Sequence, residues 1–147
     1  LYARRQRQMC IRDRYNHACV VDPSEAEPII NFVESKNIKL KFVLNTHHHY
    51  DHVGGNNDLK KKYKIKIVGY KNDKERIPNI DILLENNEIW KSENFEAKII
   101  HIPGHTSGHI CFYFIKEKIA FTGDTKIKKT HWGEFFLNET KSQQWYF

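Results

Sequence analysis

The segment THHHYDHVGGN places four histidines and an aspartate within a few consecutive positions. Alternate side chains of an extended segment project to the same side, so His47 and His49 are expected to point together while His48 points away. Imidazole nitrogens bind zinc at about 2.0–2.1 Å, and two of them on one side suit a single ion. Asp51 and His52 follow where the chain should already be turning, so they could reach a second ion.

Two more polar residues follow apolar stretches much further along the chain. His105 lies in IPGHTSGH, a Pro-Gly turn between apolar stretches, which places it in a loop at a sheet edge. Asp124 lies in IAFTGDT, at the carboxyl end of another apolar stretch. Its carboxylate could bridge two cations, because each oxygen can face one of them. A histidine-rich tract alone can be a surface metal-affinity patch, but this combination of motifs favours a built metal site.

The sequence pattern supports the remaining candidate site residues less strongly. Asp22 ends its apolar stretch as VVDP, where it is either a turn-forming residue or an acceptor that orients a metal-binding imidazole. His109 can serve as an orienting partner in the same way. His17, His101 and His131 are isolated, and we interpret them as ordinary surface or strand residues.

The apolar periodicity predicts an α+β fold. Strands are expected over residues 18–22, 40–46 and 65–70, and helices over residues 24–37 and 58–63. This alternation implies a mainly parallel sheet in the first half. From residue 80 onward, short apolar stretches separated by polar turns predict antiparallel strands, beginning with DILL at 81–84. We therefore expect two sheets packed face to face with helices outside.

Length and composition limit which class of protein this chain can belong to. A chain of 147 residues suits one domain with a real core. No apolar run approaches the roughly 18 residues that span a bilayer, so we expect no membrane partner. Cys19 and Cys111 lie in apolar stretches and form no CxxC pair, which favours buried free thiols and a reducing, cytoplasmic setting.

The net charge of +6 is unevenly distributed. Residues 1–14 hold five of the six arginines, whereas the later cations are almost all lysines interspersed with acids. We expect this first segment to be non-native or a disordered basic arm, with residues 15–147 forming a partial domain. The remainder has no basic cluster, so a nucleic-acid partner is not expected.

The motifs THHHYDHVGGN, PGHTSGH and FTGDT together resemble the metallo-β-lactamase superfamily. The stretch IPNIDILLENNEIWKSENFEAKIIHIPGHTSGHICFYF is similar to its hydroxyacylglutathione hydrolase (glyoxalase II) branch. The similarity runs from about Tyr15 to Asp124. It implies a four-layer αββα sandwich with the site at one edge between the sheets, here incomplete at both ends.

The resemblance also implies a set of metal ligands. They are His47, His49 and His105 for one ion, Asp51 and His52 for a second, and Asp124 bridging the two. Asp51 and Asp124 are in addition the implied catalytic residues. The expected cofactor is Zn²⁺, two ions per complete site, with iron or manganese as alternatives.

The implied substrate is a small glutathione thioester, S-D-lactoylglutathione, which would be cleaved to D-lactate and glutathione by a monomeric enzyme. Two cations can make hydroxide available from water near neutral pH, and a leaving thiolate with a pKa of about 8.5 needs little help from an acid. Alternatives are a mononuclear iron dioxygenase of sulfur (persulfide) substrates from the same superfamily, and an inactive metal-binding fragment.

The C-terminal stretch departs from the pattern of the branch. The family takes a further histidine well downstream of GDT, for which His131 is too close. WGEFFLNET is the nearest match to the glutathione-binding stretch, with Phe136 at the aromatic position and Glu134 where a basic residue is expected. We therefore predict a fragment whose second metal site and thioester pocket are incomplete.

Overall fold

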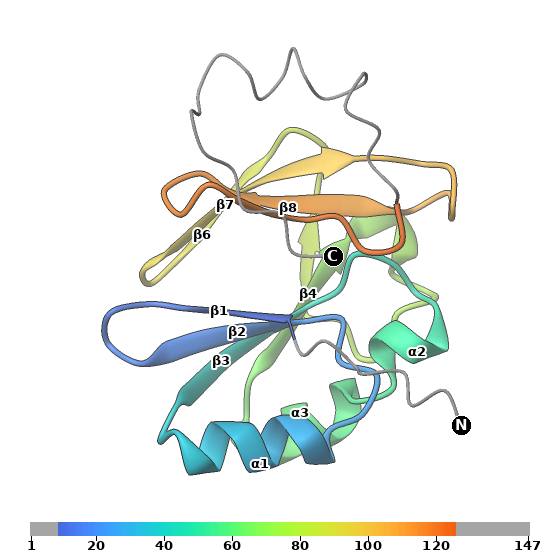
Figure 1. The fold of residues 1–147 in the computed structure, drawn as a ribbon. Helices are drawn as coiled ribbons and strands as arrows, with labels where there is room; N and C mark the ends of the chain where they lie inside the picture. The colour runs from blue at the N-terminus through green and yellow to red at the C-terminus, as the bar shows by residue number, and fades with distance from the viewer. Residues whose placement is uncertain (1–8, 126–147) are drawn as a thin grey trace, which may run out of the picture.

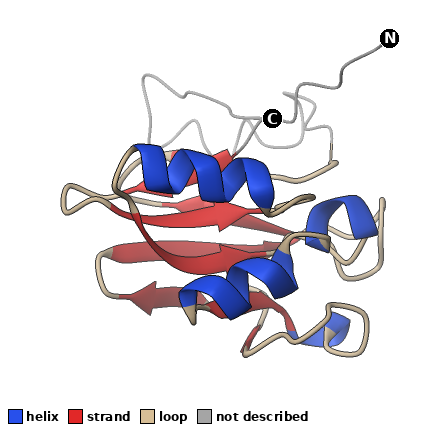
Figure 2. Ribbon diagram, turned by 90° about the horizontal axis from the view of Figure 1, so that it is seen from below, coloured by secondary structure: helices blue, strands red, loops and turns tan. Residues whose placement is uncertain are grey.

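Two β-sheets stacked face to face form the body of the protein, and helices cover the outer face of the first sheet (Figures 1 and 2). The computed structural model describes residues 9–125. The first sheet has the strand order β1-β2-β3-β4-β5 and the second the order β6-β7-β8-β9. The predicted α+β sandwich is confirmed, and within the described residues it comprises a helical layer and both sheet layers.

The first sheet is built from β-α-β units. Its strands are β1 Met9–Arg12, β2 His17–Val21, β3 Lys39–Leu44, β4 Lys66–Tyr70 and β5 Ile82–Leu84. Strands β2 to β5 run parallel, and β1 is antiparallel to β2. Helix α1, Glu27–Ser35, connects β2 to β3, and helix α3, Asn56–Tyr63, lies between β3 and β4. Nearly continuous apolar runs such as those of β2 and β4 suit a parallel sheet covered on both faces.

Three sequence-based expectations change here. β5 pairs in parallel with β4 rather than antiparallel, because the intervening segment, which contains the 3₁₀ helix η1 (Lys71–Asp73), acts as a crossover. The expected disorder of residues 1–14 is wrong for β1, whose Ile11 enters the core between the sheets. Helix α1 begins at Glu27 rather than residue 24, with Ala26 as N-cap and a proline in its first turn.

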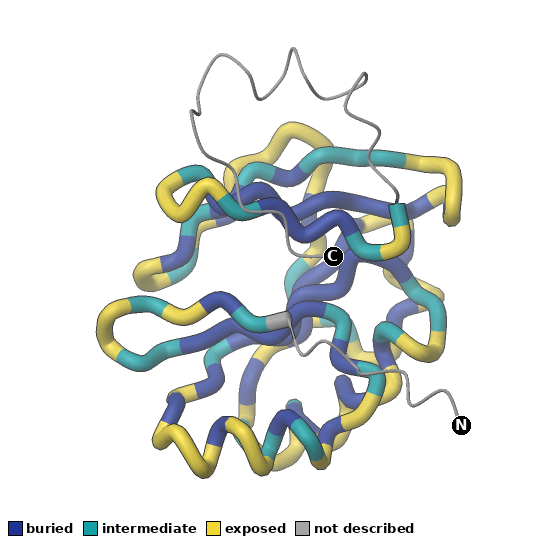
Figure 3. The backbone as a smooth tube through the Cα atoms, in the orientation of Figure 1, coloured by how far each residue is buried: buried dark blue, intermediate teal, exposed yellow. Residues whose placement is uncertain are grey.

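The second sheet is antiparallel throughout, as its polar turns predict. Its strands are β6 Ile89–Ser92, β7 Phe95–His101, β8 Ile110–Phe114 and β9 Ile119–Phe121. Buried apolar residues of both sheets form one cluster, and Figure 3 shows in dark blue the buried stretches of the strands that face each other. Phe42 of β3 meets Trp90 of β6 edge to face, with ring centroids 5.1 Å apart. Such aromatic pairs add about 0.5–1.5 kcal/mol beyond their burial and help to hold the sheets together.

A second apolar cluster joins the helices to the first sheet. Ile29 and Val33 of α1 and Leu59 of α3 pack with the helix-facing residues of β3 and β4, including Val43 and Ile67. None of the helices within residues 9–125 is long and apolar enough to cross a membrane.

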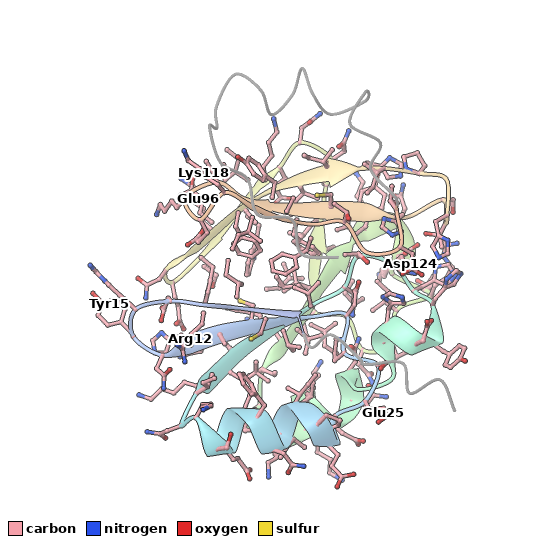
Figure 4. The ribbon with its side chains drawn as sticks, viewed as in Figure 1. Arg12, Tyr15, Glu25, Glu96, Lys118 and Asp124 are labelled. Atoms are coloured by element: carbon pink, nitrogen blue, oxygen red, sulfur yellow. The ribbon has the colours of Figure 1, made fainter. Side chains whose placement is uncertain are left out.

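One edge of the sandwich collects the loops that carry the chemically active residues. Helix α2, Tyr50–Val53, follows β3 at this edge, and Asp124 lies beside it, at the opposite end of the molecule from Tyr15 (Figure 4). The backbone N–H of Ile110 donates to the carbonyl of Thr46 over 2.9 Å and so links the two sheets there. The carboxyl ends of parallel strands meet at such an edge, which is where α/β proteins place their sites.

Candidate metal centre

The end of β3 delivers the first histidine in a fixed position. Asn45, Thr46 and His47 follow Leu44 and are completely buried. The side chains of Asn45 and Asn56 exchange hydrogen bonds of 2.7 and 3.4 Å, and Asn45 also donates to the carbonyl of His52 over 3.0 Å. These contacts pin the turn into α2, which has His49 as its N-cap residue.

Four side chains from three separate segments converge at this edge. Each offers one ligand atom, and these atoms lie within 4.8 Å of one another: His47, His49, His105 and Asp124. The Nε2 of His105 is 3.0 Å from the Nδ1 of His49 and 3.2 Å from a carboxylate oxygen of Asp124. That same oxygen lies 3.9 Å from the Nε2 of His47.

The donor set fits a metal ion. The Nε2 of His47 is buried and finds no hydrogen-bond partner among the described residues. A buried polar atom without a partner is costly and calls for an explanation. Three imidazoles and one carboxylate are ligands that zinc accepts, so an ion held by these residues would satisfy the orphaned nitrogen.

A second pair of residues lies on the other side of Asp124. The Nε2 of His52 is 3.2 Å from Asp124 Oδ1 and 3.7 Å from a carboxylate oxygen of Asp51. Asp124 therefore turns one oxygen to the three-histidine group and the other to His52. This arrangement could hold a second cation, and the ligand roles of these residues stay predictions.

Asp22 is buried behind His52 and acts as an acceptor for its neighbours. It accepts hydrogen bonds from the backbone N–H of Thr46 over 2.7 Å and from the Thr46 hydroxyl over 2.5 Å. The Nδ1 of His52 lies 3.1 Å from the same carboxylate. A carboxylate that contacts one ring nitrogen of a histidine fixes its tautomer and leaves the other nitrogen free for a metal. Asp22, His47 and His52 also bring their ligand atoms close together. We interpret them as a set in which Asp22 orients the imidazoles.

Burial and neighbouring charges shift the pKa values of three imidazoles in and beside the site, those of His47, His52 and His109. Burial, reinforced by the surrounding histidines, lowers the pKa of His47 to about 2, which keeps this residue neutral. Burial also lowers the pKa of His109 to about 4. For His52 burial acts in the same direction, but the carboxylates of Asp22, Asp124 and Asp51 outweigh it and raise the pKa to about 9. Metal binding needs a neutral imidazole, so a metal ion at His52 must displace a proton.

His109 and His48 take places next to the ligands. The ring of His109 is completely buried and stacks on that of His47, with centroids 4.6 Å apart and an interplanar angle of 23°. His109 lies outside the groups whose ligand atoms converge, so it supports the site by packing. His48 turns to Asp73, with 3.5 Å between Nδ1 and the carboxylate.

Some residues that shape the site escape sequence reasoning. Thr46, which contacts both Asp22 and His47, had a weak signal as a polar residue ending a buried strand. Asp73 had none, because it lies in a charged stretch typical of a surface loop. His101 is the last residue of β7, in agreement with its interpretation as a strand residue, and its Nε2 lies 2.8 Å from the carbonyl oxygen of Ser107.

His17 forms ion pairs with Asp13 and Glu93 and stays outside the converging groups. The predicted residues Phe136 and Glu134, together with His131, lie outside the described residues.

Comparison with known proteins decides the family. The sequence profile of the Metallo-beta-lactamase superfamily matches residues 11–86 and 76–134. The chain belongs to the metallo-beta-lactamase superfamily. The resemblance inferred from the motifs is thereby confirmed, and the site occupies the edge between the sheets that the superfamily resemblance predicts.

Two similar proteins within the superfamily carry the same name. A hydroxyacylglutathione hydrolase of Pelagibacter ubique is 60% identical over 125 residues, which are 79% of this chain and 52% of that protein. A hydroxyacylglutathione hydrolase of Methylococcus capsulatus is 43% identical over 105 residues, 71% of this chain and 41% of that protein. The chain thus spans about half the length of the curated relatives it matches.

A solved structure agrees on the fold. The BLEG-1 B3 metallo-beta-lactamase superposes with a TM-score of 0.75 at 22% identity, covering 82% of this chain and 67% of that one. At this identity the likeness concerns the fold alone.

Proposed function

We propose that this chain carries the metal centre of a hydroxyacylglutathione hydrolase, which cleaves S-D-lactoylglutathione to D-lactate and glutathione. The observation that carries the proposal is the convergence of His47, His49, His105 and Asp124 within 4.8 Å. The 60% identity to the Pelagibacter relative supports the choice of substrate class.

The two faces of Asp124 favour a pair of cations over a single one. One carboxylate oxygen lies 3.2 Å from His105 and the other 3.2 Å from His52. Asp51 is half-exposed and lies 3.7 Å from His52, on the same side as Asp124. We infer that these residues would hold two zinc ions, with iron or manganese as substitutes, and that Asp124 would offer a ligand oxygen to each. This geometry favours the hydrolase over a mononuclear iron dioxygenase.

The chemistry follows from these positions. Cations bound there would supply Lewis acidity that activates water and polarises the thioester carbonyl. Burial lowers the pKa of His47 to about 2, so its imidazole is neutral and available to bind a cation. Asp51, whose side chain is 46% exposed, would accept a hydrogen bond from the incoming water. The leaving thiolate has an ordinary pKa of about 8.5, so the chain needs no strong acid to protonate it.

The test has two parts, because the chain covers about half of the relatives. Zinc content is measured first on this chain, with His49→Ala as the variant and His17→Ala as a control from the opposite end of the molecule. We expect His49→Ala to lose most of its zinc and His17→Ala to retain it. Unchanged zinc content in His49→Ala would contradict the metal centre.

Thioester hydrolysis is then measured on the zinc-loaded chain and on a chimera in which this chain replaces the matching part of the Pelagibacter relative. Release of glutathione from S-D-lactoylglutathione is followed with a thiol reagent. We expect turnover in the chimera that His49→Ala abolishes. A zinc-loaded chimera without thioesterase activity would refute the substrate assignment, and oxygen uptake with glutathione persulfide would support the dioxygenase instead.

A further inference from the structure

Asp73 is a completely buried carboxylate outside the set of converging ligands. It ends η1 on the segment between β4 and β5, and its exposed fraction is zero. One carboxylate oxygen contacts the guanidinium of Arg76, and the other lies 3.5 Å from the Nδ1 of His48. A buried charge costs several kcal/mol unless it is paired. Its position therefore calls for a reason beyond the folding of a surface segment.

The loop between β7 and β8 rests on this carboxylate. A Cβ added at Gly108 would overlap the carboxylate of Asp73, so the backbone there passes directly over it. Arg76 donates from the same guanidinium nitrogen to the hydroxyl of Ser107 over 3.1 Å. The carbonyl of Ser107 is in turn 2.8 Å from the Nε2 of His101. Asp73 and Arg76 thus hold the loop at Ser107 and Gly108.

The same loop supplies a metal-binding candidate, His105, whose ring contacts are with other histidines of the site, His47, His49 and His109. His105 is 35% exposed, and a Cβ at the preceding Gly104 would meet nothing within 4 Å. Its position relative to His49, with 3.0 Å between ring nitrogens, depends on where the loop is fastened. Asp73 also faces His48, which lies between the other two metal-binding histidines. One carboxylate is therefore in contact with both segments that supply imidazoles.

We propose that Asp73 is a positioning residue that sets the separation of His105 from His47 and His49, with Arg76 as its link to the loop. The inference rests on the proposed function, since it takes these histidines to be metal ligands. Without the carboxylate, the backbone bond from Ile110 to Thr46 still joins the two segments, but the loop at Ser107 and Gly108 loses its fastening and His105 can shift relative to the end of β3. The ion would then be held by a less well-ordered set of imidazoles.

The decisive variant is Asp73→Asn, which keeps the shape under Gly108 and removes the charge. The control is Asp81→Asn, because Asp81 is likewise a paired carboxylate but lies outside the converging groups: it accepts hydrogen bonds from Lys60 over 2.6 Å and from the backbone N–H of Ile67 over 2.8 Å. Zinc affinity is measured by chelator competition well below the melting temperature, and the visible spectrum of bound Co²⁺ reports the ligand geometry. Removal of groups that orient ligands typically weakens metal affinity by about 10–100-fold.

We expect that loss and an altered Co²⁺ spectrum in Asp73→Asn, but not in Asp81→Asn. A purely structural role would lower the melting temperature and leave the zinc affinity of the folded chain unchanged. Zinc affinity within about twofold of the unmodified chain, in a folded Asp73→Asn, overturns the proposal.

Ser107→Ala decides the matter if Asp73→Asn does not fold, because it removes one hydroxyl from an exposed loop. We expect roughly threefold to tenfold weaker zinc binding, the size of one lost hydrogen bond, at an unchanged melting temperature. Its effect should not add to that of Arg76→Gln, since the two act through one contact. Unchanged zinc affinity in Ser107→Ala overturns the proposal. If His49→Ala also keeps its zinc, the metal centre itself is refuted rather than the positioning role.

Discussion

Gly123 offers a sharp test of how tightly the site is packed, through the substitution Gly123→Ala. Its φ is +55°, in the left-handed region where an L-residue costs about 1–2 kcal/mol. The added Cβ would overlap the hydroxyl of Thr46 and lie 2.7 Å from the Nε2 of His109. Neither neighbour can yield cheaply, because Thr46 is bonded to Asp22 and His109 is completely buried.

Overpacking of this kind costs about 1–3 kcal/mol, so the total for Gly123→Ala is about 2–5 kcal/mol. In a domain of this size that corresponds to a fall in melting temperature on the order of 10 °C. Asp124 follows directly, so its carboxylate should move with respect to His52 and His105 and zinc affinity should fall as well. Thermal unfolding followed by circular dichroism, with and without zinc, measures both effects.

The control is Gly69→Ala in β4. Gly69 lacks a positive φ, and its Cβ would meet the ends of Ile77 and Ile80 at 3.0 Å, which can rotate aside, and the carbonyl oxygen of Asn45 at an ordinary contact distance of 3.6 Å. We expect a loss of less than about 1 kcal/mol there. Equal melting temperatures and equal zinc affinities for the two variants would refute the claim that the Gly123 turn is held against unyielding neighbours.

Three further predictions concern the same region and the core. Asp22→Asn should lower the pKa of His52 from about 9 and weaken zinc binding by about 10–100-fold, as measured by NMR titration and chelator competition. For the metal-free chain, the low pKa values of His47 and His109 mean that the unfolded chain binds protons below pH about 6.5 that the folded chain does not. His52, whose raised pKa opposes this near pH 6.5, is protonated in both states below pH about 5.5. The free energy of unfolding should therefore fall on acidification from pH about 5.5 towards 4, by about 1.4 kcal/mol per pH unit for each imidazole that stays neutral in the folded chain; a flat profile in urea titrations would contradict this. Burial raises the pKa of Cys111 to about 12, so alkylation detected by mass spectrometry should reach this thiol only on global unfolding, and rapid native labelling would be inconsistent with its burial.

Much of the fold could be predicted because apolar periodicity is a local property. The runs around Val20 and Val43 predict buried strands, and the structure places them in neighbouring parallel positions. The sheet assignment of Ile82–Leu84 could not be predicted, because a three-residue strand carries no pattern that selects its partner. Likewise the pairing of Met9–Arg12 with β2 depends on an open sheet edge, which composition does not reveal.

The sequence alone identified the site residues that lie close together along the chain. The spacing of His47 and His49 places both at the end of one strand, since alternate side chains share a face. His105 and Asp124 could be named because each follows an apolar stretch next to a glycine, and the structure brings them within reach of those histidines.

Only the tertiary structure decided which residues support that site. Asp22 and Thr46 are 24 positions apart, and Arg76 and Ser107 are 31 apart, yet each pair shares a hydrogen bond. Asp73 lies in a charged stretch whose composition predicts solvent exposure, yet its side chain is completely buried. Contacts of this kind arise where loops from different strands meet, and local spacing cannot encode them because they depend on how the two sheets pack.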